Sequence, residues 1–143
     1  MSTILSYQMN YAGKVGLAVA MDYARGWGLD NIWERVRSLA ELLRGALAEI
    51  PGVTVRDIGA ERCGIVTFTV DGLSADELQQ ALAARAMNVT TSTVDSTRFD
   101  MEARHLEELV RASVHYYNDE TEVTRFCDAV AEMAMSRTTA VTM

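Results

Sequence analysis

The sequence predicts a two-layer α+β fold, in which helices pack on a small, mostly antiparallel sheet and a long apolar helix precedes them. Three observations lead to this prediction. Several segments repeat apolar residues at helical spacing, and others alternate with a period of two. The two kinds follow one another in the order helix, helix, strand, strand, helix, strand, strand, helix. A chain of 143 residues has the length of one domain.

The first helix is expected at about residues 11–25 and is unusually apolar. Only Lys14 and Asp22 are charged in the stretch before Arg25. A helix that is apolar nearly all round must be covered on nearly all sides. We therefore expect it to lie between two bodies, and a second chain can supply one of them.

Three further helices are predicted from caps and apolar stripes. Asp30 or Asn31 is a plausible N-cap for the second helix, whose leucines and isoleucines recur at helical spacing up to residue 50. Ser74 and Asp119 each stand three residues before a glutamate, which is the pattern of a capping box. These two residues predict where the third and the last helix begin.

Four strands are predicted from alternation and β-branched residues. They are expected at about residues 53–55, 64–70, 88–94 and 109–117. Residues 95–100 are expected to form a loop. The strands and the last three helices give the α+β order.

The domain organisation is expected to be simple. Residues 1–9 form an N-terminal extension, residues 10–135 form one domain, and residues 136–143 form a tail. The tail is predicted to be loose because no periodicity is left after Arg137.

The composition argues against several classes of partner. The formal charge is −7, from 13 basic and 20 acidic residues, whereas binding to nucleic-acid phosphates needs a surplus of Lys and Arg. No apolar run is long enough to cross a membrane, and the N-terminus lacks the basic start of a secretory signal. Two cysteines are too few for a disulfide framework. We therefore expect a cytoplasmic protein that binds neither nucleic acid nor membranes.

The segment 109–117 is the strongest candidate for chemistry. One face of this strand is apolar, and the other carries Arg111, Ser113 and His115 at a spacing of two. An arginine in this place could bind a carboxylate through a planar pair of hydrogen bonds. The alternative is an ordinary polar face turned to solvent. His105 and His115 show no recognised metal-ligand spacing, so we expect no metal site.

The residues around this strand also carry a family signature. The pattern is an arginine, a small residue and a serine, then Tyr-Asn and an acidic residue with a glutamate three positions on. Its residues are Arg111, Ala112, Ser113, Tyr117, Asn118, Asp119 and Glu122. The pattern resembles the C-terminal signature of class V aminotransferases, which are pyridoxal-phosphate (PLP) enzymes of fold type I. Residues 10–133 resemble the family in the right order, most closely its isopenicillin-N-epimerase-like and C–S-lyase-like members.

The resemblance implies roles for single residues. Arg111 matches the arginine that binds the α-carboxylate of the amino-acid substrate in this family. Ser113 and Asn118 match motif positions with structural roles, and His115 is a neighbour without an assigned role. The lysine that forms the Schiff base with PLP lies upstream in the family, and Lys14 belongs to a different motif. We therefore expect no catalytic residue and no bound cofactor in this chain alone.

The resemblance also bears on the reaction. Cysteine desulfurases carry a catalytic cysteine in the loop that corresponds to about residues 90–100, and this chain has none there. Desulfurase chemistry of that kind is therefore not expected.

Three hypotheses for the function follow. The first is the small C-terminal domain of a class V enzyme, inactive alone and completed by a missing large-domain chain or a homo-oligomer. The second is a non-catalytic module that pairs with itself or a partner through the apolar first helix. The third is a regulatory domain that binds a small carboxylate ligand.

Overall fold

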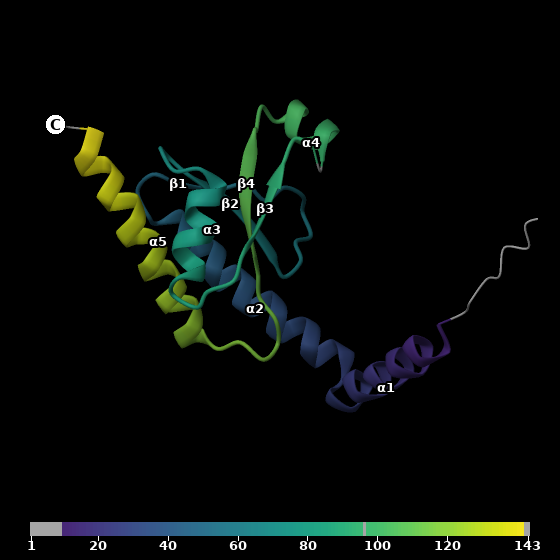
Figure 1. Ribbon diagram of the computed structural model, residues 1–143. Coiled ribbons are helices and arrows are strands. Elements are labelled where there is room, and N and C mark those ends of the chain that lie inside the picture. Colours follow the sequence, from purple (N-terminus) through teal and green to yellow (C-terminus); the bar gives the residue numbers. More distant parts are fainter. Residues whose placement is uncertain (1–9, 96, 142–143) are drawn as a thin grey trace, which may run out of the picture. The chain divides into compact units, whose positions relative to one another are not determined.

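The computed structural model describes residues 10–95 and 97–141 of the chain. The chain divides into two compact units, Met1–Trp33 and Glu34–Met143. The described part of the first unit holds helix α1 (Tyr11–Trp27) and the start of helix α2 (Leu29–Ala48) (Figure 1). The second unit holds the rest of α2, all four strands and the remaining helices.

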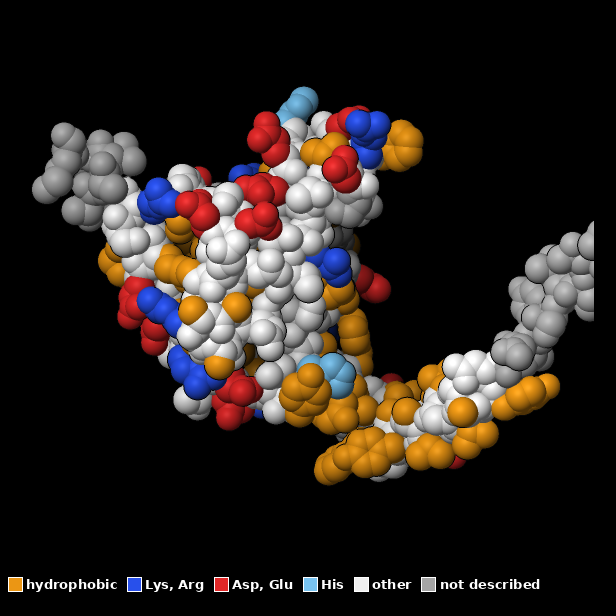
Figure 2. All heavy atoms as spheres, in the orientation of Figure 1, with side chains coloured by type: hydrophobic (Ala, Val, Ile, Leu, Met, Phe, Trp, Pro, Cys, Tyr) orange, Lys and Arg blue, Asp and Glu red, His pale blue; other side chains and the backbone are white. Residues whose placement is uncertain are grey.

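Helix α1 is the long apolar helix that the sequence predicts. It begins after Asn10, whose side chain accepts a hydrogen bond from the Gly13 backbone at 2.8 Å. None of its residues is buried, and Figure 2 shows hydrophobic side chains along it. The expected cap of the next helix is wrong, because α2 begins earlier, at Leu29. The side chain of Asn31 instead donates to the carbonyl oxygen of Trp27, at the end of α1.

The second unit contains a four-stranded antiparallel sheet, as the sequence predicts. Its strands are β1 (Val53–Val55), β2 (Ile65–Val70), β3 (Thr90–Thr93) and β4 (Glu108–Ser113). They lie in the order β1-β2-β4-β3, and each pair of neighbours is antiparallel. The last strand therefore lies between two earlier strands, in the interior of the sheet.

One face of the sheet, the apolar face, packs with helices. Helices α2, α3 (Ala75–Ala83) and α5 (Glu120–Val141) contribute side chains to one hydrophobic cluster with this face. Alternation places every second residue of β1 and β2, and Val110 and Ala112 of β4, in or against the cluster, as expected for a sheet covered on one side. The largest fully buried side chains include Phe68, Leu39, Leu47, Leu78, Leu82, Val66, Val110 and Val130. The predicted apolar stripes of all three helices supply this core.

The opposite face, the polar face, carries hydroxyl and charged side chains. Thr67 of β2 pairs with Arg111 of β4, which also pairs with Thr90 of β3. A short helix, α4 (Arg98–Ala103), lies where the sequence predicts a loop to residue 100, so that prediction is wrong. Its Met101 is fully buried, and ion pairs four residues apart on or next to it support a helical turn.

Two further boundaries differ from the sequence prediction. The strand expected to reach residue 117 ends at Ser113. The reason is a turn: Asn118 accepts a hydrogen bond from the His115 backbone through its side chain and donates one to the His115 carbonyl oxygen. Helix α5 continues to Val141, past the residue at which periodicity ends in the sequence.

Both predicted capping boxes are confirmed. The Ser74 hydroxyl and the Asp119 carboxylate each accept a hydrogen bond from the backbone three residues on, and the glutamate there accepts one in return. Among the helices that the structure describes, none is long and apolar enough to span a bilayer.

Candidate functional site

Arg111 lies at the centre of the polar face. Alternation along β4 turns Val110 and Ala112 into the core and Arg111 to the opposite side. Its neighbours across the sheet are Thr67 and Thr90, and its side chain is partly buried. Because β4 is an interior strand, Arg111 is held on a rigid element between two neighbours.

A pocket of about 380 Å³ opens beside Arg111, and we call it the arginine pocket. Five of its lining residues are arginines and three carry carboxylates. The lining residues are Arg44, Arg56, Asp57, Ile58, Glu61, Arg62, Cys63, Ile65, Thr67, Asp100, Arg104 and Arg111. All of them belong to the second unit.

Most charges in the arginine pocket are already paired. Arg44 binds Asp57, with 2.5 Å between Nε and Oδ2, and both side chains are almost fully buried. Arg104 binds Asp100 at 2.8 Å, and Arg62 binds a glutamate of α2 at 3.1 Å. Among the residues that the structure describes, none makes an ion pair or a side-chain hydrogen bond with Arg111. Its guanidinium is therefore the group best placed to take an anion from outside.

The Arg44–Asp57 pair completes the edge of β2. Strand β1 ends at Val55, and beyond the bond from the Arg56 N–H to the Thr67 carbonyl oxygen it offers no backbone partner to the first half of β2. The Asp57 carboxylate accepts from the backbone N–H and the hydroxyl of Thr67, at 2.8 and 2.6 Å. Arg44 donates to the carbonyl oxygens of Cys63 and Ile65, at 2.7 and 3.0 Å. Buried backbone groups must be paired, and here two side chains take the place of a strand.

A close approach of α2 to β2 helps to hold this corner. A Cβ atom at Gly64 would lie 2.5 Å from Cγ1 of Val36 and 3.0 Å from the carbonyl oxygen of Val114. Only glycine allows the two elements to meet at this distance. The start of β2 is therefore fixed both by packing and by the Arg44–Asp57 pair.

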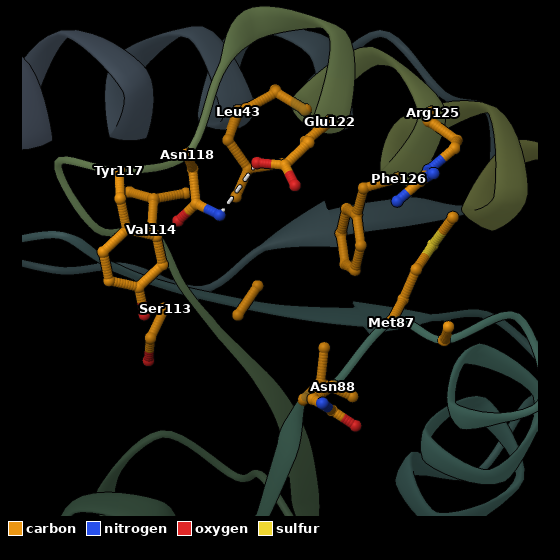
Figure 3. Close-up of a pocket in the computed structure, with 14 residues that line it drawn as sticks. Leu43, Met87, Asn88, Ser113, Val114, Tyr117, Asn118, Glu122, Arg125 and Phe126 are labelled. Atoms are coloured by element: carbon orange, nitrogen blue, oxygen red, sulfur yellow. Dashed lines mark hydrogen bonds between the residues drawn. The ribbon is translucent and has the colours of Figure 1, made fainter.

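Two of the predicted neighbours of Arg111 line a different pocket. Ser113 and Asn118 belong to a pocket of about 290 Å³ that we call the helix-side pocket. Figure 3 shows Tyr117, Val114 and Ser113 along one wall, and residues of α5 and the segment before β3 opposite them. The Asn118 side chain donates to Glu122 at 3.0 Å, which orders the start of α5. The structure therefore brings Ser113 and Asn118 together with each other, but not into the arginine pocket.

His115 lines neither pocket. Its ring stacks on Tyr117, with centroids 4.5 Å apart and an angle of 24° between the planes. Its backbone N–H donates to Asn118 as part of the turn after β4. Among the described residues, no three His, Cys, Asp or Glu side chains gather as metal ligands.

The turn after β4 is tied to α2 by a charged pair. Arg35 binds Glu120 and also donates to the carbonyl oxygen of Asn118 at 3.0 Å. The hydrogen bond from Arg35 lowers the pKa of the Glu120 carboxyl below its ordinary value. The Tyr-Asn part of the motif thus helps to join α2 to the turn after β4, whereas Arg111 lies on the strand itself.

The sequence pattern did not reveal most of the arginine pocket. Arg44 lies on α2, Arg56 follows β1, and Arg104 follows α4. They meet only because the sheet order brings β1 and β4 to either side of β2. The one usable signal was the charged pair Arg56-Asp57 directly after Val55, where the alternation of the strand ends.

Comparison with known proteins decides the family. Residues 8–126 match the family described as aminotransferase class-V. The chain belongs to the class V aminotransferases. The resemblance carried by Arg111 and its motif is thereby confirmed at the level of the family.

Curated relatives of this class V chain carry the name cysteine desulfurase. A probable cysteine desulfurase of Xylella fastidiosa (strain Temecula1) is 27% identical over 124 residues, which are 87% of this chain and 30% of the relative. One of Mycolicibacterium paratuberculosis is 30% identical, over 87% of this chain and 18% of the relative. The cysteine desulfurase of Haloferax volcanii is 30% identical, over 81% of this chain and 27% of the relative. The chain thus spans less than a third of these relatives.

Solved structures agree with the fold. The cysteine desulfurase of Thermococcus onnurineus NA1 matches with a TM-score of 0.83 and 26% identity, over 89% of this chain and 32% of the other. The cystine C–S lyase C-DES, in complex with cysteine persulfide, has a TM-score of 0.66 and 24% identity, and it supports the fold alone. It covers 81% of this chain and 28% of its own. The expected likeness to epimerase-like members stays a prediction.

The two cysteines of this class V chain lie in different surroundings. Its cysteines are Cys63 and Cys127, and none lies between Thr90 and Asp100. Cys63 is exposed and lines the arginine pocket, whereas Cys127 is buried. Burial raises the pKa of the Cys127 thiol to about 11, which keeps it protonated.

Proposed function

We propose that this chain is the small C-terminal domain of a PLP-dependent class V enzyme that acts on an amino-acid substrate, and that Arg111 binds the α-carboxylate. The observation that carries the proposal is the state of Arg111. It is partly buried in the arginine pocket, and no carboxylate among the described residues neutralises it. A guanidinium presents two parallel N–H donors, which match the two oxygens of a carboxylate.

The cofactor is assigned to the rest of such an enzyme. A C-DES structure, with 25% identity and a TM-score of 0.55, holds glycine covalently linked to PLP. PLP supplies the electron sink for amino-acid chemistry. The arginine pocket does not fit PLP by itself, because no lysine lines it and the single lysine of the chain is Lys14, in the first unit. We therefore expect this chain alone to be inactive.

The contribution of this chain is to bind and orient. Arg111 holds one end of the substrate, while its neighbour Thr67 is fixed by hydrogen bonds to Asp57. A carboxylate bound in a partly buried pocket is less screened by salt than one on an open surface. Orientation by a rigid strand is the form of help that a small domain can give to chemistry that takes place elsewhere. Without a cysteine between residues 90 and 100, we do not propose desulfurase chemistry of the loop-cysteine kind.

The test is a titration of the purified chain with propionate, followed by NMR signals of the arginine side chains. We expect weak binding, with a dissociation constant of about 10–100 mM, because one charged hydrogen-bonded pair contributes about 1.5–3 kcal/mol. The substitution Arg111→Gln should abolish the response. Arg98→Gln is the matched control, because Arg98 is exposed and outside the pocket lining, and it should leave the response unchanged.

Equal responses of the two variants would rule out Arg111 as the carboxylate-binding residue. No response in the native chain, at any concentration that keeps it folded, would contradict the proposal as well. Circular dichroism spectra of all variants would show whether they fold.

A second candidate is a non-catalytic module that pairs with itself or with a partner. The apolar α1 favours it, because Val15 and Tyr23 have exposed fractions of 65% and 61%. Sedimentation of the purified chain separates the two candidates. A stable dimer that shows no carboxylate response favours the module, and a carboxylate response that depends on Arg111 favours the enzyme domain.

A further inference from the structure

A row of residues crosses the sheet on the polar face. The backbone N–H of Arg56 donates to the Thr67 carbonyl oxygen at 2.7 Å, directly after β1. Thr67 in turn pairs with Arg111 on β4. Neighbouring strands lie about 5 Å apart, so the backbones of the two arginines are separated by about 10 Å. Arginine side chains are long enough to converge from this distance on one small ligand.

Arg56 shares the unusual state of Arg111. Its Nε donates to the hydroxyl of Thr69 at 3.0 Å, which is a neutral partner. Its carbonyl oxygen accepts from Arg104, which holds its backbone in place. Within the described part of the chain, no carboxylate pairs with the Arg56 guanidinium. Both Arg56 and Arg111 line the arginine pocket.

The other charges of the pocket do not neutralise these two groups. Asp57 is taken by Arg44 and Asp100 by Arg104. Glu61 is the remaining carboxylate of the lining, and it is exposed. Two partly buried guanidinium groups that face one pocket repel each other, and an anion between them removes this repulsion. One carboxylate can satisfy only part of this charge.

We infer that the arginine pocket selects a ligand with two acidic groups, and that Arg56 is the residue that selects the second one. The ligand class is a small dicarboxylate, and in the complete enzyme an amino acid with an acidic group besides its α-carboxylate. This inference rests on the proposed role of Arg111, which binds the first carboxylate. Arg56 then sets specificity, because a ligand with one carboxylate leaves it unpaired.

The experiment compares succinate with propionate on the purified full chain, at constant ionic strength. NMR titrations would be run on the native chain, Arg56→Gln, Arg111→Gln and the surface control Arg98→Gln. We expect the native chain and the control to bind succinate about tenfold more tightly than propionate, as one more charged hydrogen bond provides. Arg56→Gln should lose this preference and still bind propionate as the native chain does. Arg111→Gln should lose both ligands.

The two proposals fail in different ways. If Arg56→Gln keeps the full preference for succinate, or the native chain shows no preference, Arg56 does not select a second acidic group. The role of Arg111 is then unaffected. If Arg111→Gln still binds propionate like the native chain, the proposed function itself is wrong. Thermal melting of each variant shows that a lost response is not a lost fold. Arg56→Lys, which keeps the charge but not the planar donor pair, should retain part of the preference.

Discussion

The two faces of the sheet share the same four strands, but one face is buried under helices and the other lines an open pocket. On the apolar face, Val66, Phe68 and Val110 are at most 1% exposed and pack with three helices. On the polar face, Thr67 and Arg111 stand one residue away along the same strands and line an open pocket. A change of one position in the sequence thus moves a side chain from the core to the candidate site.

The two faces therefore serve different properties: the apolar face stabilises the fold, and the polar face is the candidate for ligand binding. The apolar face removes large side chains from water, and this burial is the main stabilising term of a domain. On the polar face, no carboxylate among the residues that the structure describes pairs with Arg111 or Arg56, and unpaired charges near each other do not stabilise a fold. We therefore expect substitutions on the apolar face to change the free energy of unfolding, and substitutions of the unpaired arginines to change ligand binding.

The largest effect is expected for Phe68→Ala. Phe68 is fully buried, and its ring meets that of Phe126 edge to face, with centroids 6.1 Å apart. Its removal leaves a cavity between sheet and helices, which should lower the free energy of unfolding by about 4 kcal/mol. Urea denaturation measures this change. Phe99→Ala is the matched control, because Phe99 of α4 is 91% exposed, and its effect should stay within about 0.5 kcal/mol. If both variants lost similar free energy of unfolding, burial on the apolar face would not be what stabilises the domain.

The substitution Asp57→Asn should lower the free energy of unfolding by about 3 kcal/mol, because it leaves the buried charge of Arg44 without its charged partner. The side chains of Asp57 and Arg44 are only 7% and 5% exposed. The control is Asp100→Asn, because Asp100 is 47% exposed in its pair with Arg104. Exposed pairs contribute about 1 kcal/mol at most. If the urea midpoints of the two variants agree, the Arg44–Asp57 pair does not hold the pocket wall.

Periodicity in the sequence was enough to predict which face each strand residue takes. The alternation of residues 109–117 predicted one apolar face and a second face with Arg111, and the structure buries Val110 and Ala112 while Arg111 lies on the other side. The stripe of α2 and the capping box at Ser74 were also readable, because both depend on residues within a few positions of each other. Local spacing therefore predicted the elements and the faces that they bury.

The rest depends on contacts between distant residues. The end of β4 at Ser113 is set by the Asn118 side chain, which competes with the ladder for the His115 backbone. The arginine pocket depends on β4 lying next to β2, and no period within one segment encodes that neighbour. Arg56 could be recognised as a candidate only after the register had placed it across Thr67 from Arg111.

The smallest effect on the fold is expected when Cys63 is alkylated, because its thiol lies at the arginine pocket and outside the apolar cluster. Cys63 is exposed at the arginine pocket, while Cys127 packs in the apolar cluster with its pKa raised to about 11 by burial. At pH 8, the native chain should therefore take up one equivalent of iodoacetamide, at Cys63, and a second only in denaturant. Mass spectrometry of digests gives the sites. The free energy of unfolding of the labelled chain should change by less than about 0.5 kcal/mol, because the added group lies outside the core. Equal labelling of both thiols under native conditions would mean that the apolar face opens far more often than its packing implies.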